Sequence, residues 1–412
     1  MDIFFISCFL FPDCFDKMIS MKVAIIGSSG AGLYSAIFQK KNFPKDEVHV
    51  FDKNIKIARK LRATGNGKGN ILNMNAKEEC YNNPSFMRPL LMEYNFSELQ
   101  GQLASLGIIL CNDGDLVYPL SKDANAYADY LAKVAQDMGI AFHNETKVID
   151  YKKDGTCYRL FTDKGDFLFD KIIFSTGGKS QEKLGSDGSL FKAFANHGYK
   201  IIPLKPSLCP IKTKEKTKSI SGLRHEAKAT LTYGDQIIRE EEGELLFKDD
   251  GLSGIMIFNL SAILNRLEDI NKSKIYIDLF PKVSLTALTS DLLDSSKKHD
   301  FFLDAYFVKP FKEYLLEKAG LKEGNMGKAE IFKLAKTLKG LLFQPKELYG
   351  FDNSQVSAGG IALEEVDCHL QSKKEEGIYF VGECLDIDGL CGGYNLTWCL
   401  ISSLIVTKKE EE

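Results

Sequence analysis

The strongest constraint on the fold is a glycine-rich turn that lies between an apolar run and a helical segment near the start of the chain. Lys22 to Ile26 is a compact apolar run that predicts a strand, and the turn after it reads Gly27-Ser28-Ser29-Gly30-Ala31-Gly32. Leu33 to Gln39 continues as a helix, and Glu47 to Phe51 predicts a second strand. The pattern is a β-α-β unit, and Asp52 follows it about 20 residues beyond the turn, where dinucleotide-binding folds place an acid.

This unit predicts a site for the pyrophosphate and ribose of a dinucleotide. The helix N-terminus offers free N–H groups and a partial positive charge, while Asp52, with Lys53 beside it, can hold the adenosine ribose. Ser29 replaces the second glycine of the G-x-G-x-x-G fingerprint, so its side chain must tolerate or bind the pyrophosphate. The turn residues predicted to contact the cofactor are Gly27, Ser29, Gly30, Ala31 and Gly32. A tight turn without a ligand is the alternative interpretation.

Two distant segments favour FAD over NAD(P) as the bound dinucleotide. Lys171 to Phe174 is an apolar run that ends in Ser175-Thr176-Gly177-Gly178, which resembles the A-T-G segment of two-dinucleotide-domain flavoproteins. Gly377 to Val381 ends in Gly382-Glu383, which resembles their second FAD segment. No second G-x-G-x-x-G pattern lies between them, so the sequence lacks the separate nicotinamide domain of the disulfide reductases. Strands that stop at such turns predict one parallel sheet whose carboxyl ends hold the ligand.

The middle of the chain has a different pattern of apolar and polar residues, which predicts an inserted domain. Residues 201 to 281 favour short strands with turns, and the helical patterns follow at Leu285 to Leu293, Phe307 to Ala319 and Lys328 to Leu341. The expected fold is α/β: a discontinuous Rossmann-type FAD-binding domain of residues 21 to 198 and 353 to 408, interrupted by an inserted substrate domain of residues 199 to 352. That insertion is expected to be β-barrel-like over about 199 to 281 and helical over about 282 to 341. Residues 1 to 20 are expected to form an extension outside the fold.

The net charge and the cysteine spacing limit the classes of partner and cofactor that we expect. The 53 Lys and Arg nearly balance the 56 Asp and Glu, which leaves a net charge of -3 and no positive field that would gather nucleic acid or anionic lipid. A small-molecule substrate is therefore expected, with no nucleic acid and no membrane; the oligomeric state is left open. The 10 cysteines form no C-x-x-C pair and the histidines no metal spacing, so we expect reduced thiols in a cytoplasmic protein and no metal.

Four further segments carry a family resemblance. They are Ala58 to Asn70, Leu116 to Ser121, Gly251 to Gly254 and, as the most diagnostic, Gly382-Glu383-Cys384-Leu385-Asp386-Ile387-Asp388-Gly389 followed by Gly392-Gly393-Tyr394-Asn395-Leu396. In this order they resemble the BaiN/YhiN-like family, over nearly the whole chain from Met21 to about Ile405. The resemblance implies an FAD-dependent, NAD(P)-linked oxidoreductase of the aminoacetone oxidase-like kind, with NAD(P)H as a transient co-substrate.

The chain departs from the family pattern at two positions. Gly69 stands where the family usually has a cysteine before the asparagine, so no thiol role carries over. Asp249 aligns where the family often has a histidine, which removes that histidine as an acid here. The sequence therefore assigns no catalytic acid or base.

The resemblance and the residue chemistry together name the remaining cofactor contacts. Glycines of the 65 to 69 loop allow close approach of a ligand, and lysines beside them offset pyrophosphate charge. A helix that starts after Gly392-Gly393 directs its dipole at the flavin; Asn395 donates to a flavin carbonyl or caps that helix. Glu383 binds the ribityl chain or, alternatively, one acid of the 383 to 388 cluster donates a proton to substrate. The expected contacts are Lys60, Thr64, Gly65, Gly67, Asn70, Val148, Ser175, Thr176, Gly177, Gly382, Glu383, Gly393, Tyr394, Asn395 and Leu396.

The leading functional hypothesis is an NAD(P)H-dependent reductase that delivers hydride from the flavin to an activated double bond of a small organic acceptor. One alternative is a flavin amine or alcohol oxidase or dehydrogenase, and another is a flavin-dependent RNA-modifying or RNA-binding protein. The insertion is expected to cover the flavin and supply the substrate contacts, with Gly251 to Gly254 nearest the ring because small residues permit close packing.

Overall fold

A computed structural model describes residues 20–409 of the chain. The expected extension of residues 1 to 20 lies outside the described residues except for Ser20. Among residues 20–409, no helix has the length and apolar character needed to cross a membrane.

The first part of the molecule is a Rossmann-type domain built on a five-stranded parallel sheet. Its strand order is β20-β10-β1-β2-β6, and every neighbouring pair in it runs parallel. Strand β1 is buried from Val23 to Ile26, as expected of a strand covered on both faces. The bounds are Lys22–Ile26 (β1), Glu47–Phe51 (β2), Ala141–His143 (β6), Lys171–Phe174 (β10) and Ile378–Phe380 (β20). The predicted Rossmann fold with a parallel sheet is confirmed.

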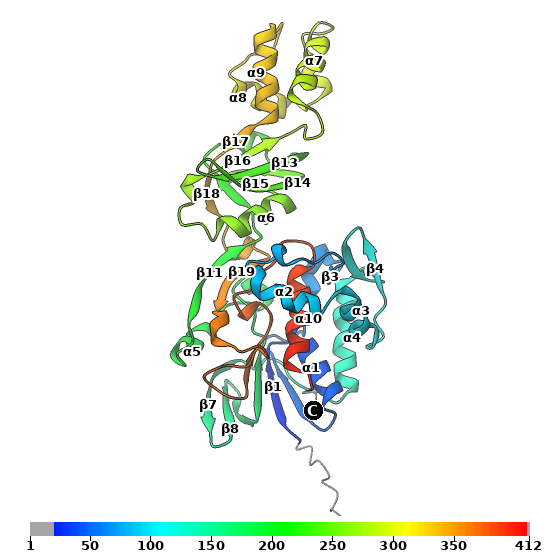
Figure 1. The fold of residues 1–412 in the computed structure, drawn as a ribbon, viewed down its shortest axis with the longest axis vertical. Helices are drawn as coiled ribbons and strands as arrows, with labels where there is room; N and C mark the ends of the chain where they lie inside the picture. The colour runs from blue at the N-terminus through cyan, green and yellow to red at the C-terminus, as the bar shows by residue number, and fades with distance from the viewer. Residues whose placement is uncertain (1–19, 410–412) are drawn as a thin grey trace, which may run out of the picture.

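Helices and two small antiparallel sheets surround this sheet. Helices α1 and α10 lie side by side against it, with α4 beyond them (Figure 1). The helices are Gly30–Asn42 (α1), Pro84–Glu93 (α2), Phe96–Ala104 (α3), Ala124–Asp137 (α4), Phe191–Asn196 (α5) and Tyr394–Val406 (α10). The small sheets are β3-β5-β4, of Leu72–Asn73, Leu116–Pro119 and Leu110–Asp113, and β7-β8-β9, of Val148–Asp154, Cys157–Thr162 and Gly165–Phe169.

The second part is the inserted domain, which extends away from the Rossmann domain (Figure 1). Its centre is a seven-stranded antiparallel sheet of order β17-β16-β13-β14-β15-β12-β18. These strands are Ile211–Thr213 (β12), Arg224–Tyr233 (β13), Gln236–Lys248 (β14), Gly251–Ser253 (β15), Ser273–Asp278 (β16), Leu341–Phe343 (β17) and Pro345–Leu348 (β18). Helices Leu285–Ser296 (α7), Lys309–Ala319 (α8) and Lys328–Lys339 (α9) form its far end.

One helix of the insertion faces the Rossmann domain. It is Ile255–Leu264 (α6), which lies between the seven-stranded sheet and the first domain (Figure 1). The chain crosses between the domains on an antiparallel pair, Ile201–Ser207 (β11) with Val356–Ile361 (β19). Each domain has its own hydrophobic core, one of residues 23–199 and 361–406 and the other of residues 211–343. The two domains therefore fold around separate centres and meet at α6 and the crossing strands.

Candidate cofactor and substrate cavity

A cavity of about 910 Å³ lies where the two domains meet, and both of them line it. This volume is at the upper end of ligand pockets in proteins, which span about 300 to 1,000 Å³. From the Rossmann domain it receives the turns that follow β1, β2, β10 and β20, that is, the carboxyl ends of the parallel strands. The cavity thus occupies the place that parallel α/β sheets give to their ligands.

The turn after β1 lines the cavity with backbone groups that no large side chain covers. Gly27 has a φ of +104°, and a Cβ there would lie 2.5 Å from the carbonyl oxygen of Ser175. Ser29 caps α1 without any side-chain hydrogen bond, so the first-turn N–H groups of the helix have no side-chain partner there. Gly30 and Ala31 line the cavity beside it. A pyrophosphate held at this helix N-terminus fits these groups.

Gly32 acts differently from its neighbours. A Cβ at Gly32 would lie 1.9 Å from the carbonyl oxygen of Gly27, and Gly32 is not among the residues that line the cavity. The third glycine therefore lets the helix pack against the turn.

Asp52 lines the cavity at the end of β2 and also braces the turn. Its Oδ2 accepts from the backbone N of Ser28 at 2.9 Å and from the Ser28 hydroxyl at 2.5 Å. Its Oδ1 accepts from the backbone N and the Nδ2 of Asn54, both at 2.8 Å. The carboxylate therefore joins the glycine-rich turn to the residues after β2. A contact with a ribose hydroxyl stays a prediction.

Two buried hydroxyls provide a direct test of whether a polar ligand belongs in the cavity. Thr176 Oγ1 and Ser186 Oγ are buried and have no hydrogen-bond partner within residues 20–409, and both residues line the cavity. Unsatisfied buried hydroxyls cost free energy in a folded protein, and such groups commonly mark the place of a ligand or water. Together with the open helix N-terminus, these hydroxyls fit the diphosphate and sugar groups of FAD.

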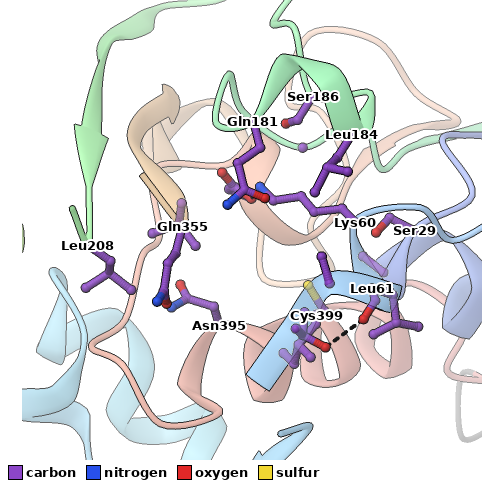
Figure 2. A pocket seen from close by; sticks show the side chains of 18 of the residues that line it. Ser29, Lys60, Leu61, Gln181, Leu184, Ser186, Leu208, Gln355, Asn395 and Cys399 are labelled. Atoms are coloured by element: carbon purple, nitrogen blue, oxygen red, sulfur yellow. Dashed lines mark hydrogen bonds and ion pairs between the residues drawn. The ribbon is translucent and has the colours of Figure 1, made fainter. Parts of the chain in front are cut away.

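Lys60 and Glu383, distant in sequence, meet in the cavity wall. Lys60 Nζ lies 2.7 Å from Glu383 Oε2, and the two side chains are 19% and 16% exposed. Figure 2 shows Lys60 among the side chains that line the cavity. Glu383 Oε1 accepts from the backbone N of Ser357 at 2.8 Å. Lys60 and Glu383, each predicted to contact the cofactor, are thus the two partners of one ion pair.

A segment that the sequence reasoning missed forms another wall. Lys53 Nζ lies 2.5 Å from Asp187 Oδ2, which ties this segment to the end of β2. The glycines at 185 and 188 were the available signal, because glycine lets a backbone loop approach a ligand closely. The cavity-lining residues of this segment are Gln181, Leu184, Gly185, Ser186, Asp187, Gly188, Ser189 and Leu190. Figure 2 shows Gln181, Leu184 and Ser186 among them.

The start of α10 forms a further part of the cavity wall. Gly393, with a φ of +91°, precedes the helix, and a Cβ there would lie 2.4 Å from the carbonyl oxygen of Leu72. Asn395 accepts from the backbone N of Gly389 at 2.9 Å and donates to its carbonyl oxygen at 2.9 Å. Its amide therefore holds the preceding loop in place. Leu396 lines the cavity beside it.

Most predicted cofactor contacts line this one cavity. The predicted residues that do so are Gly27, Ser29, Gly30, Ala31, Asp52, Lys53, Lys60, Thr64, Gly65, Asn70, Val148, Ser175, Thr176, Gly177, Glu383, Gly393, Asn395 and Leu396. Four do not line it, namely Gly32, Gly67, Gly382 and Tyr394. Gly382 is buried against α10, where its carbonyl oxygen accepts from Trp398 Nε1 at 3.0 Å, and the Tyr394 ring packs against Tyr81 with centroids 6.0 Å apart.

The insertion contributes an apolar patch to the cavity, beside the charged side chains of Arg224, Glu242 and Glu244. Of the Gly251 to Gly254 segment, Ser253 and Gly254 line the cavity, whereas Gly251 and Leu252 do not. Gly254 approaches the carbonyl oxygen of Glu244 so closely that a Cβ would lie 2.2 Å away. Proximity of this segment to a flavin ring stays a prediction. The apolar side chains of the patch are Leu208, Leu246, Ile255, Met256 and Phe258. Asp249 does not line the cavity; its carboxylate accepts from the Ser221 hydroxyl.

Two cysteine thiols in the cavity wall, those of Cys391 and Cys399, have raised pKa values. Burial raises the pKa of Cys391 and of Cys399 to about 12. Because the thiolate is the reactive form of cysteine, both side chains stay mainly in the less reactive thiol form near neutral pH.

The fold and the cavity define a flavin-dependent oxidoreductase of the Rossmann type. The chain belongs to the family of the HI0933-like protein Rossmann domain, whose model matches residues 21–409.

Two relatives and one solved structure illustrate the similarity. The 3-dehydro-bile acid delta(4,6)-reductase of Clostridium scindens is 28% identical over 95% of this chain and 99% of its own. The ribosomal RNA dihydrouridine synthase of Haemophilus influenzae is 26% identical over 92% of this chain and 96% of its own. The open conformation of a flavocytochrome c3 fumarate reductase, at 14% identity, superimposes with a TM-score of 0.47 over 94% of this chain and 77% of that one.

Proposed function

We propose that this chain is an FAD-dependent reductase that takes electrons from NADH or NADPH and reduces an activated carbon–carbon double bond of a small apolar acceptor. The observation that carries the proposal is the cavity itself, which runs from the backbone-rich turns of the Rossmann domain to the apolar end of the insertion without a break. One end suits a dinucleotide and the other suits an apolar molecule.

The chain's own residues would divide the work as follows. Bound FAD supplies the two-electron chemistry. The N–H groups of the α1 first turn bind its pyrophosphate, and the Thr176 and Ser186 hydroxyls find their partners in its polar groups. The Lys60–Glu383 pair would join two of the cofactor-binding turns. Its ammonium and its carboxylate would each be able to bind polar groups of the cofactor. Leu246, Met256 and their apolar neighbours exclude water and hold the acceptor against the cofactor.

The names of the two relatives support reduction over amine or alcohol oxidation. One is a reductase of a delta(4,6) compound and the other makes dihydrouridine, and each name denotes a carbon–carbon double bond that is reduced. A double bond next to a carbonyl group accepts hydride readily, so the shared acceptor chemistry is an unsaturated carbonyl compound.

Charge at the opening of the cavity favours a small acceptor over RNA. Glu242 and Glu244 are exposed residues that line the cavity, so a phosphate backbone there would meet two carboxylates. Arg224, the cation on the same side, is already paired with Glu244 at 2.5 Å. Nucleic-acid sites instead gather unpaired Lys and Arg side chains. RNA uridine stays the second candidate because of the dihydrouridine synthase relative.

Anaerobic stopped-flow absorbance of the FAD-loaded protein tests the proposal. We expect NADH or NADPH to bleach the flavin band, and the reduced protein to be reoxidised faster by cyclohexenone or a steroid enone than by uridine-containing RNA or by oxygen. Fast reoxidation by oxygen with no response to any enone would support an oxidase. Fast reoxidation by RNA alone would support the second candidate.

Ser253→Phe separates the two ends of the cavity. Ser253 is 6% exposed and lines the cavity from β15, so a phenyl ring there would occupy acceptor space. We expect slower turnover with the enone, while FAD stays bound with its spectrum unchanged. Ser219→Phe, at an exposed serine of the same domain outside this cavity, is the control and should leave turnover unaltered. Release of FAD by Ser253→Phe would place β15 in the cofactor site.

A further inference from the structure

Leu208 adopts a backbone conformation that leucine rarely takes. Its φ is +54°, in the left-handed region, where the Cβ of an L residue crowds the following carbonyl oxygen. Glycine would adopt the same conformation without this crowding. The residue lies between β11 and β12, on the chain's first crossing from the Rossmann domain to the insertion, and it is 1% exposed.

The surroundings of Leu208 hold it in this conformation from three sides. The hydroxyl of Ser207, just before it, donates to Asp388 of the Rossmann domain at 2.9 Å. The backbone N of Cys209, just after it, donates to the hydroxyl of Ser261 on α6 at 3.0 Å. The carbonyl oxygen of Leu208 itself accepts from the backbone N of Gln355 at 3.1 Å. Both domains therefore determine where this one side chain lies.

The side chain of Leu208 faces the cavity instead of a core. It lines the cavity near Gln355 and Asn395 (Figure 2). Although it is buried, it belongs to neither the Rossmann core nor the inserted core.

Leu370 is an internal comparison for the same conformation. It also has a positive φ, +59°, and is also 1% exposed, but it packs inside the Rossmann core and does not line the cavity. Core packing explains the leucine at 370, while at 208 the buried isobutyl group contacts the cavity space. Strained backbone that is held by its surroundings tends to occur at ligand sites.

The geometry points to Leu208 as a specificity-determining residue, whose isobutyl group limits the size of the acceptor that the insertion end of the cavity admits. Leu246 and Met256 supply other parts of the apolar wall from the insertion's own sheet and helix. Leu208 comes from the crossing segment, so its position also depends on how the two domains meet. The inference rests on the proposed function only for the nature of the acceptor, an apolar unsaturated ketone.

Size-dependent binding to the FAD-loaded full-length protein tests this role. The probes are cyclohexenone, a two-ring enone and a four-ring steroid enone, and the readout is the dissociation constant from perturbation of the oxidised flavin spectrum. We expect Leu208→Gly and Leu208→Ala to shift the ratio of dissociation constants toward the larger enones by about tenfold or more, since a few methyl groups in an apolar pocket have effects of this size. Leu370→Gly should lower the melting temperature and leave the ratio at the wild-type value.

Each outcome decides the matter. An unchanged size ratio in both Leu208 variants overturns the role, as does release of FAD from Leu208→Ala, which would place the side chain in the cofactor site. Failure of every enone to bind wild type and variants alike overturns it too. Size-dependent binding that changes with Leu208 but is followed by no reduction of any enone would sustain this inference and refute the proposed reductase. Leu208→Ala carries the test if Leu208→Gly does not fold.

Discussion

The two ends of the cavity are built in different ways. At the Rossmann end the contacts come from backbone and small residues, such as Gly27, the first turn of α1 and the hydroxyl of Thr176. At the insertion end they include an apolar patch, with Met256 and Phe258 on α6, that has no counterpart at the Rossmann end. The first kind of site fixes the position of one ligand through directional hydrogen bonds. The second kind selects by volume, and many apolar molecules of one size satisfy it equally.

This difference decides what a substitution at each end should do. A change at the Rossmann end should alter cofactor affinity and the stability of the domain together, because the same backbone serves both. A change at the insertion end should alter the choice of acceptor and leave the cofactor in place. The junction between the ends should couple them, and the largest expected effect therefore lies there.

Arg266→Met should break the junction. Arg266, just after α6, lies 3.0 Å from Asp386 Oδ1 and is also paired with Asp388, which is 3% exposed. Loss of the guanidinium leaves a buried carboxylate uncompensated, which costs about 3 to 5 kcal/mol. Chemical denaturation would measure the loss. Arg159→Met, which removes the solvent-exposed pair with Asp154, should cost less than about 1 kcal/mol.

The effect of Arg266→Met should depend on pH in a definite direction. Burial raises the pKa of Asp388 even with Arg266 beside it, and removal of Arg266 should raise it further. A carboxyl group with a raised folded-state pKa destabilises the fold once the pH exceeds the pKa of the unfolded chain, and this penalty disappears as pH falls. The stability deficit should therefore be largest at neutral pH and shrink in acid. A deficit that grows in acid would show that Asp388 is not the group left unpaired.

Gly27→Ala should test the backbone character of the Rossmann end. The new Cβ would lie 2.5 Å from the Ser175 carbonyl oxygen at a φ of +104°, so both a clash and backbone strain oppose it. We expect a loss of about 3 kcal/mol in stability together with loss of FAD.

Gly67→Ala is the matched control for Gly27→Ala. Gly67 has a φ of +83° but no atom within 4 Å of the new Cβ, and it does not line the cavity. It should cost only the strain of about 1 to 2 kcal/mol and leave FAD bound. Denaturation curves and flavin content check both variants, and equal flavin loss in the two would contradict the assignment.

The same contrast explains how much of the molecule could be predicted from sequence. β1, β2 and β10 begin and end at the predicted residues. In β1 and β10 the signal is a continuous buried apolar run, Val23 to Ile26 and Ile172 to Phe174, that stops at a glycine or polar turn. α6 was missed, because Ile255–Leu264 is apolar on nearly all sides and has no helical period. β14 continues to Lys248, well past the predicted Arg239, since its alternation is carried by charged residues. Leu208 left no signal, because neither its conformation nor its cavity contact is visible in a residue type.

The buried hydroxyls should give the smallest effect, with opposite signs for stability and for FAD affinity. Thr176→Val keeps the shape of the side chain and removes a hydroxyl that has no partner within residues 20–409. The protein without FAD should become more stable by about 1 kcal/mol, because an unsatisfied buried group is removed. If FAD supplies the missing partner, its binding should weaken by about 1 kcal/mol, or roughly fivefold in dissociation constant.

A control for this change exists in the other domain. Thr217 Oγ1 is also buried without a partner among the described residues, but it lies in the insertion and does not line this cavity. Thr217→Val should therefore raise the stability of the FAD-free protein by a similar amount and leave FAD affinity unchanged. Thermal unfolding without flavin and fluorescence titration with FAD measure the two effects separately. Parallel behaviour of the two variants would mean that the Thr176 hydroxyl takes no part in holding the cofactor. Opposite effects on stability and affinity at Thr176 alone would place a polar group of FAD against the end of β10.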